Sequence, residues 1–222
     1  GRFNFGEKFV LSLAYEGMIR TTCGTVTFDS KGRNSNTGDS FRRALGTAVT
    51  LRFKGIDDPE KAILEMTEFL TTIIAPESVE MLTLNGQVIM QRLPIKTINA
   101  QLPTEVGKEL RKTKRRTDIE IHEVQPGETA TLYELGIPVV ETGDKYHVNV
   151  MQKVPLTIDR DNVPPSFLRT IRVIVLSEMF ADIKETDVSE TWVQEAASDD
   201  RVSVEASKAI VKTQYGDKVA FA

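Results

Sequence analysis

Residues 146–180 read YHVNVMQKVPLTIDRDNVPPSFLRTIRVIVLSEMF and combine strand and helix signals in one stretch. The first six residues, 146–151, are rich in β-branched and aromatic residues and predict a strand. Pro164-Pro165 stand where the first turn of a helix accepts proline, and a helical repeat of apolar residues follows from Ser166 to about Phe180. The residues expected to face the core are Leu168, Ile171, Val175, Leu176 and Met179. The stretch therefore indicates the α+β class.

The region upstream of this stretch has the two-residue period of strands. Residues 79–93, VEMLTLNGQVIMQRL, hold Asn85-Gly86 between two alternating runs, which predicts a tight hairpin. Further strands are expected at 117–124 and 129–133, on either side of Gln125-Pro126-Gly127.

The two ends of the chain add helices to this pattern. Near the start, we expect a helix over 7–18, strands over 19–29 and 48–53, and a turn or mobile loop over 30–40, which is rich in Gly, Asn and Ser. A helix beginning at Asp57-Asp58-Pro59-Glu60 should run to about Ala75. Its expected buried residues are Ile63, Leu64, Phe69, Leu70 and Ile73. Two weaker helices are predicted at 187–197 and 202–213.

Composition excludes several classes of protein. Of 222 residues, 40% are hydrophobic and 27% charged, which is typical of a globular protein with a real core rather than a disordered chain. No apolar run approaches the roughly 18 residues of a membrane span. A net charge of -4 argues against coating nucleic acid with the whole surface. The single cysteine, Cys23, favours a reducing compartment and is expected in the core; with only His122 and His147 beside it, no structural zinc site is expected.

The opening segment, GRFNFGEKF, is a glycine-rich turn before an expected helix, a junction that can aim backbone amides at an anion. It resembles the second glycine box of the GHKL ATPases, the superfamily of gyrase B subunits, ninety-kilodalton heat-shock chaperones, histidine kinases and MutL. In that family the segment closes the nucleotide lid and its amides hold the phosphates. Asn4 stands where the family's middle glycine usually lies. After glycine, Asn is the residue that best tolerates a left-handed backbone conformation.

Residues 45–51, LGTAVTL, resemble the strand that ends the same ATPase fold, in which a Thr hydroxyl lies near the adenine. A Gly-Thr pair before a strand is also common outside this family. Together the two resemblances imply a set of nucleotide-binding residues: Gly1, Phe3, Asn4, Phe5, Gly6, Glu7, Lys8 and Thr47.

The loop before the helix at 166–180 carries the most specific resemblance. Residues 150–163 are similar to a middle-domain segment of the heat-shock chaperones, whose loop Arg reaches the γ-phosphate of ATP in the preceding domain. That Arg corresponds to Arg160, and Gln152 and Lys153 match the Lys or Gln of related transducer domains. The implied catalytic residues are Arg160 and Lys153. The alternative is a surface pair between Arg160 and Asp159 or Asp161.

The resemblance implies three regions. These are the end of a Bergerat-type ATP-binding α/β sandwich (1–56), a transducer-like (ribosomal S5-like) α+β domain (57–182), and a truncated helical C-terminal extension (183–222). ATP and Mg²⁺ are the implied cofactors. The general base and the magnesium ligand are expected upstream, so this piece alone should not hydrolyse ATP.

Much of residues 1–180 is also similar to phage and actinobacterial ATP-binding proteins and loosely to the phage rapid-lysis A protein. No targeting signal is visible in the sequence, so the cytoplasm is the default expectation, the host's if the protein is phage-encoded. Dimerisation upon ATP binding is common among the GHKL proteins that the chain resembles, which makes a homodimer a candidate assembly. A subunit of the same fold without turnover stays open as an alternative.

Residues 108–116 form a basic run that suggests another partner. Its six cations are opposed only by Glu109 and could face nucleic-acid phosphates. The cations are Lys108, Arg111, Lys112, Lys114, Arg115 and Arg116. The alternative for this run is a solvated loop or an exposed helix turn. A non-enzymatic α+β interaction module that contacts nucleic acid is therefore the alternative function.

Overall fold

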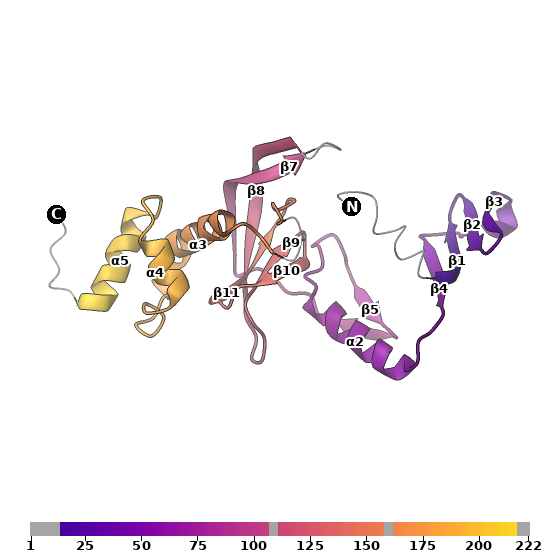
Figure 1. Cartoon of the computed structure of the whole chain (residues 1–222), viewed down its shortest axis with the longest axis horizontal. Coiled ribbons are helices and arrows are strands. Elements are labelled where there is room, and N and C mark those ends of the chain that lie inside the picture. Colours follow the sequence, from indigo (N-terminus) through magenta and orange to yellow (C-terminus); the bar gives the residue numbers. More distant parts are fainter. Residues whose placement is uncertain (1–13, 107–110, 158–161, 217–222) are drawn as a thin grey trace. The chain divides into compact units, whose positions relative to one another are not determined.

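The computed structural model describes residues 14–106, 111–157 and 162–216 (Figure 1). It is a mixed α+β structure that divides into two compact units, Gly1–Met66 and Thr67–Ala222. Within the described ranges, no helix has the length and apolar character that crossing a membrane requires.

The first unit is built on a four-stranded antiparallel sheet of order β3-β2-β1-β4. Its strands are β1 (Ala14–Thr21), β2 (Gly24–Asp29), β3 (Gly32–Asn36) and β4 (Ala48–Phe53), with a short 3-10 helix, η1 (Asp39–Phe41), before β4. The strand predicted over 48–53 is confirmed as β4, and the run predicted over 19–29 is confirmed as strand except for a turn at Thr22-Cys23, which divides it between β1 and β2.

Three expectations in this unit are wrong. Residues 14–18, expected in a helix, belong to β1, which pairs with β2 and β4 on its two sides. Residues 32–36, expected in a loop, form β3; this strand has no apolar residue and is held by backbone pairing to β2. Cys23 is exposed in the turn between β1 and β2, where its amide donates to Thr21 Oγ1 at 3.1 Å, rather than buried in the core.

The helix α2 (Pro59–Thr72) confirms the prediction made from the acidic and proline start signals. The Asp58 carboxylate accepts a hydrogen bond from the Lys61 amide at 3.0 Å, as a helix N-cap does. The expected burial of its apolar side is wrong, because Ile63, Leu64 and Phe69 are exposed and Leu70 and Ile73 are only half-buried. The predicted hairpin follows as β5 (Leu82–Leu84) and β6 (Gln87–Ile89).

The second unit contains a five-stranded sheet of order β10-β9-β11-β8-β7, in which only β9 and β11 run parallel. The strands predicted around 117–124, 129–133 and 146–151 are confirmed as β8 (Arg111–Glu123), β9 (Thr131–Glu134) and β11 (Tyr146–Val150). The expected strands did not include β7 (Lys96–Val106) and β10 (Ile137–Glu141).

Three predicted helices complete the second unit: α3 (Pro165–Met179), α4 (Thr191–Ala197) and α5 (Val204–Tyr215), with a 3-10 turn, η2 (Phe180–Asp182), after α3. They share one hydrophobic core with one face of the sheet. The sheet residues of this core are Leu102, Ile119, Ile121, Leu132, Tyr146, Val148 and Val150. The helix residues include Phe167, Ile171, Leu176, Trp192, Val193 and Ile210. Successive side chains of a strand point to opposite faces of the sheet, so the polar residues that alternate with these apolar ones lie on the opposite face.

Candidate functional site

The predicted site residues fall in different parts of the chain. Gly1 to Lys8, Lys108 and Arg160 lie outside the described residues. Thr47 is exposed immediately before β4 in the first unit. Lys153 and the basic residues of β8 belong to the second unit.

The two ends of the predicted sensor loop meet at one place. Thr157 donates to the Asn162 carbonyl through its amide at 2.9 Å and through its hydroxyl at 3.3 Å. Upstream, the Lys153 carbonyl accepts a hydrogen bond from Thr104 Oγ1 at 2.7 Å, and the Val154 amide donates to the Glu134 carboxylate at 2.7 Å. The last two bonds attach Lys153 and Val154, just upstream of the loop, to strands β7 and β9.

A cavity of about 740 Å³ borders the base of this loop. Pro155 and Pro164 line it from the two ends of the loop, and the first residues of α3 form another wall. Pro164, the N-cap residue of α3, supplies no side-chain cap. The charged residues that line the cavity are Glu105, Lys112, Arg169, Glu195, Asp199 and Arg201.

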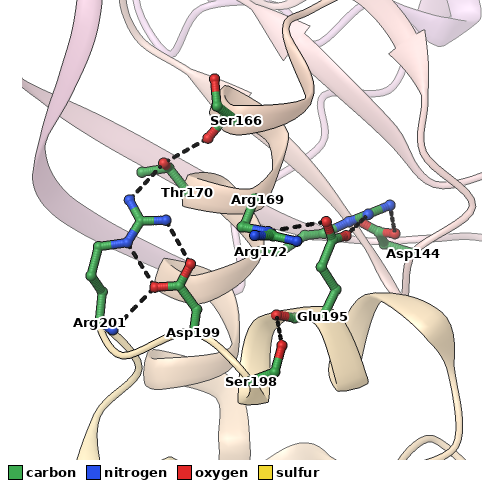
Figure 2. Close-up of polar contacts among 9 residues, drawn as sticks. All are labelled: Asp144, Ser166, Arg169, Thr170, Arg172, Glu195, Ser198, Asp199 and Arg201. Carbon is green, nitrogen blue, oxygen red and sulfur yellow. Dashed lines mark hydrogen bonds and ion pairs between the residues drawn. The ribbon is translucent and has the colours of Figure 1, made fainter.

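Ion pairs engage most of the charges near this cavity (Figure 2). Arg172, which is largely buried, donates to both oxygens of Asp144 at 2.8 and 3.0 Å and also pairs with Glu195. Burial raises the pKa of the Asp144 carboxyl above its ordinary value, although Arg172 opposes this. Burial also acts to raise the pKa of Glu195, but hydrogen bonds from Arg172 and Arg169 outweigh it and the pKa is lowered. These pairs connect α3 to α4 and to the turn before β11.

Arg201 forms a second group in Figure 2. Its guanidinium donates to both Asp199 oxygens at 2.8 Å and to Thr170 Oγ1 at 3.0 Å. Arg169 is half exposed and pairs with Glu195 at 3.2 Å, whereas Lys112 is exposed and has no ion pair within the described part of the chain. Of the cations that line this cavity, Lys112 and Arg169 would therefore lose the fewest ion pairs and hydrogen bonds on binding a ligand.

A second polar group lies on the other face of the sheet, around the buried His147. The Thr131 amide donates to His147 Nδ1 at 3.1 Å, so the ring proton is on Nε2, which donates to the Glu128 carboxylate at 3.0 Å. Arg92 binds the same carboxylate with both terminal nitrogens. The hydrogen bond from Arg92 is the main reason that the pKa of Glu128 is lowered to about 2. Sequence analysis missed Arg92, whose partner lies 36 residues further along the chain.

His122 lies directly opposite His147 in the register of β8 and β11 and is 1% exposed. Within the described residues neither of its ring nitrogens has a hydrogen-bond partner, although Nε2 is 3.5 Å from a Glu120 oxygen. Burial lowers the pKa of this imidazole, although Glu120 and the Leu93 backbone act in the opposite direction. His122 lines a cavity of about 650 Å³, His147 lines another of about 400 Å³, and Arg92 borders both.

Within the part of the chain that the structure describes, no three His, Cys, Asp or Glu side chains gather as a metal site would require. Comparison with protein-family models and with curated proteins finds no match to this chain.

Proposed function

We propose that this chain is the phosphate-sensing part of a GHKL-type ATPase, with the Arg160 loop as the sensor of the γ-phosphate. The observation that supports this most is the position of the loop base, closed by Thr157 and Asn162, beside the cavity at the start of α3. The proposed fold is the end of a Bergerat-type sandwich followed by a ribosomal S5-like transducer domain.

The chemistry of that cavity suits an anionic group. Pro165 has no amide hydrogen and the Phe167 amide donates to the Pro164 carbonyl at 2.8 Å, so the Ser166 amide is the one in this turn that lacks an acceptor among the described residues. The positive end of the helix dipole at this turn attracts negative charge. Lys112 and Arg169 add positive charge at the same cavity. A cation that a second domain delivers to the γ-phosphate stabilises the charge that develops during phosphoryl transfer. In this proposal Arg160 is that cation, Lys153 supports it, and contact with the phosphate couples the nucleotide to domain position.

The proposal assigns nucleotide contacts to Gly1 and residues 3–8 of the opening segment, and to Thr47. ATP with Mg²⁺ supplies the transferable phosphoryl group, and the Mg²⁺ ligand and the general base belong to an upstream segment. Strands β1 to β3 lie between the glycine box and Thr47 and are compatible with the strand hairpin that the proposed fold places there, whereas the helix expected over 7–18 is a strand from Ala14 onward. Dimerisation upon ATP binding is part of the same proposal.

The test is an ATPase assay on the protein from its full reading frame, with Arg160→Ala beside it. We expect kcat to fall at least ten-fold, which corresponds to about 1.4 kcal/mol of transition-state stabilisation. Lys184→Ala is the matched control, because Lys184 is exposed and its side chain has no ion pair in the described part of the chain. Labelled ATP in equilibrium dialysis separates binding from turnover. Absence of both binding and turnover in the intact protein would overturn the proposal.

A further inference from the structure

Strands β7 and β8 form a two-stranded ribbon that extends past the rest of the sheet (Figure 1). Their pairing runs from Lys96 opposite Ile121 to Val106 opposite Arg111. Strand β11 pairs with β8 only over residues 119–123. Over residues 111–118, β8 therefore pairs with β7 alone.

The two faces of this ribbon differ. On one face Leu102, Thr104 and Thr117 are buried, and the Thr104 hydroxyl donates to the Lys153 carbonyl. The other face carries Lys112, Lys114 and Arg116 at every second position, all exposed, at a spacing of about 7 Å. The alternative of a solvated loop or an exposed helix turn is therefore wrong in its secondary structure for residues 111–116, which form a strand, although residues 112–116 are exposed.

Two of the three cations on this face, Lys114 and Arg116, have no carboxylate directly across the ribbon, whereas Lys112 is directly opposite Glu105. Lys114 is opposite Pro103, and Arg116 is opposite Gln101. Within the described ranges, neither Lys114 nor Arg116 takes part in an ion pair. Cations that are exposed and unneutralised on a projecting strand are available to a polyanion without the loss of an internal partner.

We propose that this face of the ribbon binds double-stranded DNA. Residues 96–106 and 111–118 contain no aromatic side chain, so the stacking platform that single strands require is missing from them. The major groove of B-form DNA, about 12 Å wide, admits a two-stranded ribbon, whereas the major groove of A-form RNA is deep and too narrow for side chains to read. With a net charge of -4 on the chain, the attraction is local to this face.

This inference is independent of the ATPase proposal, and its test uses no nucleotide. The whole chain is titrated into a fluorescein-labelled duplex of about 24 base pairs, and anisotropy is followed from about 50 to about 200 mM NaCl. Three phosphate contacts predict a slope of about -3 for the logarithm of the binding constant against that of the salt concentration. The double variant Lys114→Gln/Arg116→Gln should lose at least ten-fold in affinity, with a slope shallower by about 2.

The matched control is Lys31→Gln/Arg33→Gln, which removes the same two residue types at the same spacing from an exposed part of the first unit. It should bind as the wild type does. Circular dichroism of both double variants checks that each is folded. Equal affinity of the Lys114 and Arg116 variant and the wild type would overturn the proposal. So would tighter binding of duplex RNA, of the same-sequence single strand or of poly-glutamate.

Discussion

At the residue scale, His122 and His147 are neighbours across two strands and yet differ in their hydrogen bonding. His147 has a partner on each ring nitrogen, whereas His122 is buried with neither nitrogen in a hydrogen bond within the described residues. A buried polar group without partners costs free energy, and replacing it by an apolar group of similar shape removes that cost. The His122→Leu variant should therefore be more stable at pH 7, by about 1 kcal/mol.

The burial of His122 also makes the free energy of unfolding depend on pH. The pKa of His122 in the folded chain is lowered from about 6.5, so below that pH the unfolded chain binds the proton more readily than the folded chain does. The contribution of His122 to the free energy of unfolding should thus decrease as pH falls from 7 to 5, and the loss should be smaller in His122→Leu. Urea unfolding followed by Trp192 fluorescence measures both effects. His147→Leu is the control and should be destabilised, because it leaves the buried Thr131 amide without its acceptor and removes one hydrogen-bond donor from Glu128. The same sign of the stability change in both variants would refute the argument.

At the scale of elements, the hairpin of β9 and β10 depends on one glycine. Gly136 has a φ of 82°, and a Cβ at this position would lie 1.9 Å from the carbonyl oxygen of Ile74. That backbone is held in place, since the Ile74 amide donates to the Gly136 carbonyl at 2.9 Å. We expect Gly136→Ala to lower the free energy of unfolding by more than about 2 kcal/mol, through strain and the clash together.

The control for this substitution is Gly127→Ala. Gly127 has a similar φ of 89°, but its Cβ would meet nothing within 4 Å. Its cost should be about 1 kcal/mol, from the backbone conformation alone. The difference between the denaturant midpoints of the two variants measures the clash with Ile74, because the backbone strain is common to both. Equal midpoints would show that the approach of Gly136 to Ile74 has no energetic role.

The same elements show what a sequence can predict. Helices α2 and α3 and the hairpin of β5 and β6 were predictable because start signals, apolar periodicity and turn residues are all local. Strands β7 and β10 contain Pro103 and Pro138, which disrupt a strand pattern. Both are edge strands, where a missing amide is tolerated, but an edge position is a property of the whole sheet.

The candidate sites likewise could be predicted only where their residues are close together in the sequence. The loop of Arg160 was found from contiguous residues. The group of Arg92, Glu128 and His147 comes from three separate segments, and no spacing within the sequence indicates that they meet. Likewise, the basic run was visible as a run, but its presentation on a ribbon depends on where β11 stops pairing with β8.

At the scale of the whole molecule, the division after Met66 predicts two separable unfolding events. The only tryptophan, Trp192, is buried in α4 of the second unit, so its fluorescence reports that unit alone. Far-UV circular dichroism reports both units. If the first unit unfolds independently, the two signals should give different urea midpoints, whereas a two-state chain gives coincident transitions. Coincidence of the two curves would mean that the units unfold as one.

The exposed turn between β1 and β2 allows the distance between the two units to be measured by resonance energy transfer. Cys23 is the only thiol in the sequence, it lies in the first unit, and it is open to a maleimide dye. Trp192 is the only indole and lies in the second unit. A dye on Cys23 that absorbs tryptophan emission therefore turns resonance energy transfer into a distance between the two units. Adding ATP or duplex DNA to the labelled chain then shows directly whether either partner moves one unit against the other.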